Sequence, residues 1–258
     1  MPTVSIITPS LNQGAFLQEC LDSVQTAAEM AAQPVEHFVV DGGSEDQTLE
    51  ILGNQSRARW VSGKDRGQTD AINMGLQQTS GEIVSYLCAD DLLEPEALRL
   101  VLRTFAEAPG ADAVYGDAYF LESGWKRRKT AGDFSPARLR KGNFLIQPAV
   151  FLRRSVFEKF GLLDASLKFC MDHEFWLRIS GGTKWKYVPR PLACSRLHSG
   201  AKTWGQLPAA WDEARKMQAG YGIYWRPLRD AVWMKTAGCH YYRAKRLLIA
   251  WLAKSRKP

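Results

Sequence analysis

Strand-like and helix-like segments alternate over about the first 106 residues, and this alternation restricts the possible folds more than any other feature of the chain. Short apolar runs are each followed by a stretch whose apolar side chains recur at helical spacing. Strands separated by helices are typical of βαβ units, so the pattern predicts a mainly parallel sheet. The expected strands are 4–8, 37–41, 59–62 and 83–89, and the expected helices follow Gly14 and cover about 48–52, 67–78 and 95–106.

The pattern changes after Gly110, where shorter strand-like segments are separated by irregular stretches. Strands are expected at 113–120, 147–152, 185–188 and 192–197, a hairpin or surface loop at 125–131, and helices at 172–180 and at about 205–219 and 228–253. The fold class is therefore α/β. We expect a mainly parallel, mixed sheet flanked by helices, with a C-terminal helical appendage.

The amino-acid composition limits the classes of protein to which this chain can belong. The chain has 258 residues, 45% of them hydrophobic, which is enough for one large domain with an ordinary core. Its five cysteines are widely spaced and form no C-x-x-C pair, which argues against a disulfide framework or a zinc knuckle. We expect a cytoplasmic protein, because no signal peptide precedes Thr3 and no apolar run approaches the ~20 residues that span a bilayer.

Basic charge is concentrated at the C-terminal end. Residues 226–258 contain nine Lys and Arg and one acid, Asp230, so this segment carries +8 in a chain whose net charge is +7. The rest of the chain is close to neutral, so no nucleic-acid partner is expected. A basic helix beside the apolar stretch 247–252 suits peripheral contact with the inner face of the cytoplasmic membrane. It equally suits a helix packed on the domain with a solvated basic face.

The pair Asp90-Asp91 follows a buried-strand pattern and is the strongest candidate for chemistry. Open α/β sheets bind ligands at the carboxyl ends of their strands. Carboxylate oxygens suit Mg²⁺ or Mn²⁺, and these ions commonly hold substrate phosphates. The competing interpretation is a solvated loop that caps the next helix.

Two further aspartates, Asp41 and Asp65, end or follow earlier strands. Because consecutive strands are usually neighbours in space, Asp41, Asp65 and Asp90 are expected to line one crevice. Gly42-Gly43 would allow a ligand to approach the backbone closely, and the Asp41 carboxylate can accept hydrogen bonds from a base or a sugar. A simple turn aspartate is the alternative for Asp41.

Five motifs, in this order, resemble those of family-2 glycosyltransferases of GT-A fold. They are VSIITPSLN (4–12), VVDGGSEDQT (39–48), DRGQTDAINMG (65–75), ADD (89–91) and the block from QPAVFLRRSVF (147–157) to MDHEFWLR (171–178). The resemblance covers about residues 3–203. It implies a GT-A glycosyltransferase domain over 1–203 and leaves 204–258 as the helical, basic appendage.

The resemblance implies a nucleotide-diphosphate-sugar donor, most often a UDP-sugar, bound at the strand ends. Asp41 would contact the base, and Asp65, Asp70 and Asn73 would lie near the base and ribose. The other residues that would border the nucleotide are Thr8, Pro9 and Asn12.

The resemblance also implies a divalent metal, Mn²⁺ or Mg²⁺, on the donor diphosphate. Asp91 would ligate it, and Asp90 would bind ribose or order the metal shell. His198 would complete that shell or contact a phosphate, unless it is a surface-loop histidine, and Lys202 would hold the diphosphate as a point charge.

By the same resemblance Asp172 would be the general base of an inverting transfer. The acceptor hydroxyl would attack the anomeric carbon while a nucleoside diphosphate leaves, and a carboxylate must take the hydroxyl proton. Many relatives have Glu-Asp at this position, whereas this chain has Met171-Asp172. Glu174 is a candidate helper or substitute, and Asp172 as a simple helix N-cap is the alternative.

The Gln-x-x-Arg-Trp signature of processive synthases is absent, so one transfer per acceptor is expected. The expected setting is bacterial-type surface polysaccharide or glycoconjugate assembly, with a glycan or lipid-linked acceptor. The alternative function is a nucleotide-sugar-binding regulatory protein without transferase activity. A dinucleotide-binding oxidoreductase is disfavoured, because no Gly-x-Gly-x-x-Gly follows the first strand.

Overall fold

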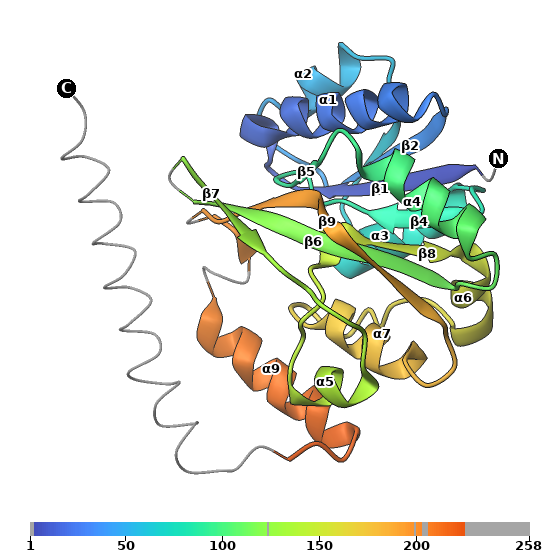
Figure 1. Ribbon diagram of the computed structural model, residues 1–258. Coiled ribbons are helices and arrows are strands. Elements are labelled where there is room, and N and C mark those ends of the chain that lie inside the picture. Colours follow the sequence, from blue (N-terminus) through green and yellow to red (C-terminus); the bar gives the residue numbers. More distant parts are fainter. Residues whose placement is uncertain (1–2, 123, 199, 203–205, 225–258) are drawn as a thin grey trace, which may run out of the picture.

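Four parallel strands form the first half of the sheet (Figure 1). The computed structural model describes residues 3–122, 124–198, 200–202 and 206–224. In spatial order these strands are β3 (Arg59–Ser62), β2 (Val35–Asp41), β1 (Val4–Ser10) and β4 (Ile83–Tyr86). They are connected by α1 (Gly14–Ala31), α2 (Thr48–Gly53) and α3 (Gln68–Gln78). The βαβ arrangement expected from the alternating pattern is confirmed.

The second half of the sheet is mixed. β8 (Val150–Arg153) is antiparallel to β4, β6 (Ala113–Glu122) is antiparallel to β8, and β9 (Trp185–Arg196) is parallel to β6. The short β5 (Leu92–Leu93) pairs with β9, and β7 (Trp125–Lys129) forms a hairpin with β6. The remaining elements are α4 (Ala97–Glu107), α5 (Pro136–Lys141), the 3₁₀ turn η1 (Gln147–Ala149), α6 (Arg154–Phe160), α7 (Met171–Ile179) and α9 (Leu207–Gly220).

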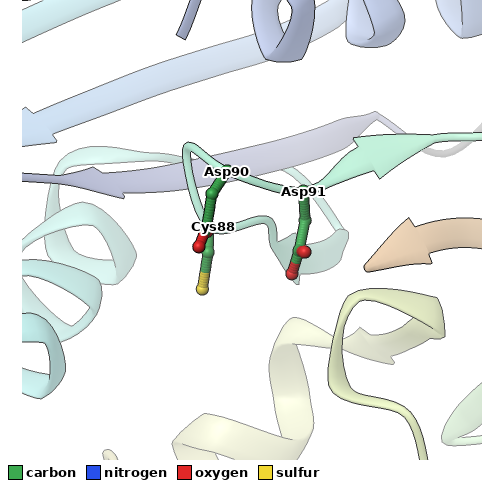
Figure 2. Close-up of side chains that lie close together, drawn as sticks. All are labelled: Cys88, Asp90 and Asp91. Atoms are coloured by element: carbon green, nitrogen blue, oxygen red, sulfur yellow. The ribbon is translucent and has the colours of Figure 1, made fainter. Parts of the chain in front are cut away.

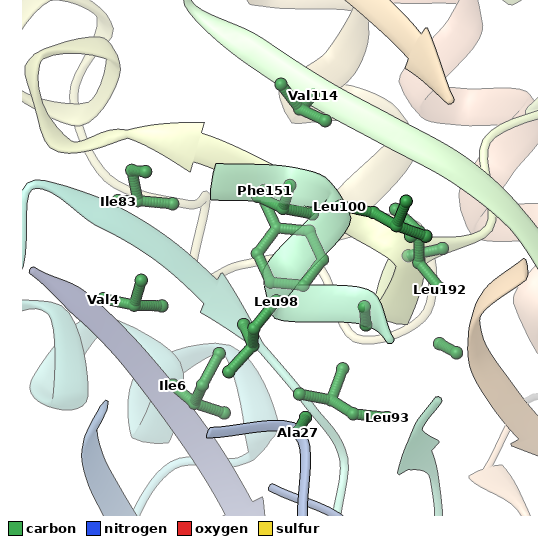
Figure 3. Packing of buried hydrophobic residues seen from close by; sticks show 14 of the residues in the cluster. Val4, Ile6, Ala27, Ile83, Leu93, Leu98, Leu100, Val114, Phe151 and Leu192 are labelled. Carbon is green, nitrogen blue, oxygen red and sulfur yellow. The ribbon is translucent and has the colours of Figure 1, made fainter. Parts of the chain in front are cut away.

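Helices cover both faces of the sheet, because successive strand residues point to opposite sides. Val4, Ile6 and Ile83 pack in one core with α1 and α4 (Figure 3). Ile7 and Val84 belong to the opposite core, which α3, α6 and α7 cover. The alternation of side chains along β1 and β4 thus places one apolar layer on each face of the sheet.

Three expected segments differ from the structure. The strand expected at 83–89 ends at Tyr86, and the chain then turns. The segment 147–152 begins with a 3₁₀ turn, because its second residue is Pro148. The strands expected at 185–188 and 192–197 are one strand, β9, whose register against β6 shifts on both sides of Asp117. That irregularity accommodates the two prolines within β9.

The first C-terminal helix, α9, packs on the core of the domain. Met217 is buried in the same cluster as α7, and Ala214 and Tyr221 pack against that cluster. The helix expected at 228–253, with its proposed membrane contact, lies outside the described residues. Within the ranges described, no helix is both long and apolar enough to cross a bilayer.

Candidate active site

A tight turn after β4 brings three side chains together. The Leu87 amide still donates to Ile7 O at 2.8 Å, and the chain then turns so that the Asp91 amide donates to Cys88 O at 2.9 Å. One potential ligand atom from each of Cys88, Asp90 and Asp91 lies within 4.8 Å of the others. Figure 2 shows all three side chains on the same side of this loop. The expected pair of carboxylates therefore sits at a strand end.

Asp91 is the buried member of this cluster, with 6% of its surface exposed. Its Oδ1 accepts a hydrogen bond from the Arg196 backbone amide at 2.9 Å, which links the β4 turn to the end of β9. Burial, and after it the negative charge of Asp90, raise the pKa of Asp91 well above that of an ordinary aspartate. The effects of burial and of Asp90 on the pKa of Asp91 thus outweigh the opposing effects of the amide hydrogen bond and of the Arg196 charge.

His198 lies beside Asp90. His198 Nε2 and Asp90 Oδ2 are 2.9 Å apart, and the imidazole packs against the Phe16 ring of α1 with centroids 4.6 Å apart. Both side chains are mostly buried, with 22% and 17% of their surfaces exposed. The structure therefore brings together the two residues that the sequence analysis placed in or next to a metal shell.

A cavity of about 520 Å³ opens at the carboxyl ends of β1 and β4, and we call it the strand-end cavity. Of the residues expected to bind a nucleotide sugar, Pro9, Asp65, Asp90 and Lys202 line it. Ser10 Oγ and Gln13 Oε1 are buried atoms of the same cavity lining that have no hydrogen-bond partner among the described residues. Buried polar atoms are normally paired, so these two indicate a place for a polar ligand.

A second cavity of about 290 Å³ contains Asp172, and we call it the Asp172 cavity. Asp172 stands in the first turn of α7, and its Oδ2 accepts a hydrogen bond from Asn143 Nδ2 at 2.9 Å. Burial raises the pKa of Asp172, although the Asn143 amide opposes that shift. The Tyr86 hydroxyl, which lines this cavity, is buried without a hydrogen-bond partner in the described part of the chain.

The two cavities share part of their lining: Gln68, Cys88, Asp91, Ser195 and Lys202. Within this shared wall, Gln68 Nε2 lies 3.0 Å from the Cys88 sulfur, and Lys202 Nζ lies 3.3 Å from Gln68 Oε1. Burial lowers the pKa of Lys202. Asp91 therefore stands at the boundary between the strand-end cavity and the Asp172 cavity.

The start of α7 is held by Glu213 of α9. The Glu213 carboxylate accepts backbone hydrogen bonds from Lys168 at 2.8 Å, Phe169 at 2.6 Å and Cys170 at 2.9 Å. Burial alone would raise the pKa of Glu213, but these amide hydrogen bonds outweigh it and lower the pKa. A side chain beyond residue 203 thus fixes the backbone immediately before Asp172.

Several expected nucleotide-binding residues occupy positions behind the cavity walls. Asp41 is fully buried, and its carboxylate accepts hydrogen bonds from the Ser44 amide at 3.0 Å and from Ser62 Oγ at 2.6 Å. Asn12 Oδ1 accepts a hydrogen bond from the Glu45 amide at 2.9 Å, and the buried Thr8 hydroxyl contacts a His37 ring nitrogen at 2.9 Å. In this structure these side chains shape the loops around the strand-end cavity.

Helix α3 contacts the loop that precedes Asp172. Asn73 Nδ2 donates to Leu163 O at 2.9 Å, and Asn73 Oδ1 accepts from the Leu163 amide at 3.1 Å. Asp70 instead forms an ion pair with Arg66 at 2.6 Å, and this contact lowers the pKa of Asp70. Asn73 therefore anchors the loop that leads to Asp172.

Sequence reasoning missed Gln68, Asn143, Ser195 and Glu213. Their partners lie from 20 to 104 positions away along the chain, the longest separation being that of Ser195 from Asp91, so no local spacing identifies them. Glu213 carried one weak signal, because it is an acid in an amphipathic helix near the end of the matched motifs.

Comparisons with known proteins identify the class of protein. The model of glycosyl transferase family 2 matches residues 5–178. A PGL/p-HBAD biosynthesis glycosyltransferase of Mycobacterium bovis is 33% identical over 185 residues, covering 69% of this chain and 69% of the relative. An uncharacterized glycosyltransferase of Rickettsia typhi is 27% identical over 215 residues, covering 78% of this chain and 66% of that protein. The chain belongs to glycosyl transferase family 2, and it is a glycosyltransferase.

Solved structures show the GT-A-type fold. Staphylococcus aureus TarS 1–349 in complex with UDP-GlcNAc aligns with a TM-score of 0.68 and 17% identity, covering 83% of this chain and 65% of that chain. Mannosyltransferase PcManGT from Pyrobaculum calidifontis, in complex with GDP-Man and Mn²⁺, aligns with a TM-score of 0.65 and 16% identity, covering 100% of this chain and 76% of that one. This chain spans about two thirds of the TarS chain.

Proposed function

We propose that this chain transfers a glycosyl group from a nucleotide-diphosphate sugar to an acceptor hydroxyl, with inversion and with Asp172 as general base. The observation that carries the proposal is the meeting of two cavities at Asp91. A donor in the strand-end cavity would present its anomeric carbon at the shared wall. An acceptor hydroxyl in the Asp172 cavity would then be held for in-line attack, with a carboxylate beside it.

The donor side is supported by the unpaired Ser10 and Gln13 atoms and by the ligands of the structural neighbours. TarS 1–349 was solved with UDP-GlcNAc and PcManGT with GDP-Man. We propose a UDP-sugar as the donor, with Pro9, Asp65 and Asp90 at the nucleoside and Lys202 at the diphosphate. We propose that the remaining residues expected at the nucleotide act indirectly, because they hold the loops around the strand-end cavity. These residues are Thr8, Asn12, Asp41, Asp70 and Asn73.

The cluster of Cys88, Asp90 and Asp91 fits a divalent cation. Burial, and after it the two aspartates, raise the pKa of the Cys88 thiol, so Cys88 is a neutral group and the two carboxylates are the hard ligands. We propose that Asp91 binds Mn²⁺ or Mg²⁺ and that Asp90 and His198 complete or order its shell. When bound, the cation would neutralise charge on the departing diphosphate.

Asp172 suits the role of general base better than Glu174. Burial gives Asp172 the raised pKa, and therefore the proton affinity, that a base requires. Glu174 lines neither cavity, and its carboxylate binds Arg178 at 2.8 Å and the Tyr221 hydroxyl at 2.6 Å. The buried Tyr86 hydroxyl is a second polar group available to an acceptor in the Asp172 cavity.

The proposed setting is glycoconjugate or surface polysaccharide assembly, with a glycan or lipid-linked acceptor. The name of the Mycobacterium bovis relative, PGL/p-HBAD biosynthesis glycosyltransferase, supports this setting. The proposed membrane contact of the basic tail remains a prediction, as does the domain boundary after residue 203.

The test is a transfer assay on a panel of UDP- and GDP-sugars with Mn²⁺, with Mg²⁺ or with EDTA. We expect nucleoside diphosphate release with one donor, loss of release in EDTA, and an inverted anomeric configuration in the product by NMR. Asp172→Asn should reduce transfer by roughly 10²-fold or more, whereas Asp212→Asn, a control on an acid that lines neither cavity, should not. Tight donor binding without release from any donor would favour the regulatory alternative.

A further inference from the structure

The hairpin strand β7 is basic and exposed, and its charges differ between its two faces. Its sequence is Trp-Lys-Arg-Arg-Lys, and every residue is solvent-exposed. Lys126 and Arg128 point to one face, because alternate strand residues share a face. Lys126 Nζ pairs with Glu94 at 2.7 Å, and Arg128 Nε donates to the buried Asp117 at 2.9 Å. The charge on this face is therefore neutralised by neighbouring acids.

The other face carries Arg127 and Lys129, and neither has an ion-pair partner among the described residues. The Arg127 guanidinium lies 6.0 Å from the centroid of the Phe120 ring, on the paired strand β6. Phe120 and Lys129 both line the Asp172 cavity, and neither lines the strand-end cavity. Lys129 therefore lies in the wall of the Asp172 cavity, and Arg127 lies beside Phe120 of the same wall.

The Asp172 cavity holds more positive than negative side chains. Lys129, Lys168 and Lys202 line it, against Asp91 and Asp172. Of these lysines, Lys202 also lines the strand-end cavity, so it belongs to the proposed donor site. Lys129 and Lys168 have no such second role. This excess of positive charge in the lining favours a ligand that carries negative charge.

We propose that the acceptor carries a phosphate group, bound by Lys129 and Arg127 at the entrance to the Asp172 cavity. This inference rests on the proposed function, because it assigns that cavity to the acceptor. Two residues apart on one strand face, the two cations are about 7 Å apart at the backbone, within reach of one phosphate or diphosphate. The guanidinium fork and the ammonium are the side chains that recognise phosphate oxygens. The phosphate would belong to a lipid carrier or to a soluble sugar phosphate.

The test compares matched charge-removing variants of the two faces. The probes are decyl phosphate and inorganic phosphate, titrated by calorimetry with UDP and Mn²⁺ at saturation so that the donor site is occupied. We expect Lys129→Gln to weaken decyl phosphate binding several-fold and Arg127→Gln/Lys129→Gln about tenfold, since each removes an exposed charge-assisted contact. Lys126→Gln, on the paired face, should stay within about twofold.

The outcomes separate this inference from the proposed function. If wild-type protein binds neither UDP nor GDP in the presence of Mn²⁺, the proposed function is wrong and the acceptor assignment falls with it. If UDP binds normally but Lys129→Gln and Lys126→Gln bind decyl phosphate equally, only the acceptor inference is overturned. Much tighter binding of decyl phosphate than of inorganic phosphate would assign a lipid carrier, and equal binding a soluble sugar phosphate.

Discussion

Removing the Glu213 carboxylate should loosen the start of α7, the helix that carries Asp172, the proposed base. Three backbone amides donate to Glu213 at 2.6–2.9 Å. Buried hydrogen bonds to a charged acceptor contribute roughly 1.5–3 kcal/mol each, but Glu213 is partly exposed and water will replace part of the loss. We therefore expect Glu213→Ala to lower the free energy of unfolding by about 3 kcal/mol. Glu213→Gln should cost about 1–1.5 kcal/mol, because its remaining oxygen can still accept from Phe169 and Cys170.

The same variants should lose turnover more than donor affinity. A displaced α7 start moves Asp172, and we expect kcat to fall about tenfold while UDP affinity is unchanged. Urea unfolding, steady-state kinetics and UDP titration measure these effects, with Asp212→Ala as the control on the same helix. A stability loss without a change in kcat would limit Glu213 to a structural role, and wild-type behaviour in both assays would refute the hydrogen-bond argument.

The pH dependence gives an independent check on the Glu213 contacts. Its pKa is lowered from 4.5 in the folded protein, so the carboxylate stabilises the fold above pH 4.5 and this contribution is lost as the pH falls through the folded-state value. The difference in unfolding free energy between wild type and Glu213→Gln should therefore shrink below pH 4.5. A difference that stays constant across this range would contradict the assignment.

Three further predictions concern the proposed catalytic groups. Asp172→Asn should reduce turnover by roughly 10²-fold or more. It should not lower stability at pH 7, because the raised pKa of Asp172 means that its ionised carboxylate destabilises the fold at that pH. Wild-type turnover of this variant, where chemistry limits the rate, would exclude Asp172 as the base. Asn143→Ala removes a hydrogen bond that favours the ionised form, so the acid limb of kcat/KM should move to higher pH, and an unmoved limb would mean that another group titrates. In Asp91→Ala, calorimetry should show UDP binding that no longer responds to Mn²⁺; a wild-type response would remove Asp91 from the metal site, and Asp90→Ala should weaken UDP binding as well.

The sequence predicted the parallel half of the fold well, because apolar periodicity is a local property. β1 to β4 and their helices follow from it, and the strand-end position of Asp91 follows from the strand that precedes it. The prediction of two strands in place of β9 was wrong. The prolines suggested that the strand is interrupted, whereas β9 continues past them with a shift in its register against β6. Neither the register nor the partner strand is visible in a local pattern.

The site was predictable only where position along a strand decides it. Asp65, Asp90 and Asp91 line one cavity, as expected of residues at strand ends, whereas Asp41, which was expected to line it too, is not among its lining residues. Asn73 forms its hydrogen bond with Leu163 across 90 positions of the chain. Glu213 binds the Phe169 amide from a helix whose packing on the domain the sequence did not indicate. Long-range hydrogen bonds of this kind appear only once the chain has folded.

The shared wall between the two cavities has a consequence for protein engineering. Gln68, Cys88 and Asp91 come from the half of the chain before α4, whereas Ser195 and Lys202 come from the half after it. A chimera that joins two relatives after α4 would combine wall residues that were selected separately. If the strand-end cavity binds the donor and the Asp172 cavity the acceptor, as proposed, the two preferences cannot be exchanged as independent modules, and a successful swap would have to carry these five positions together.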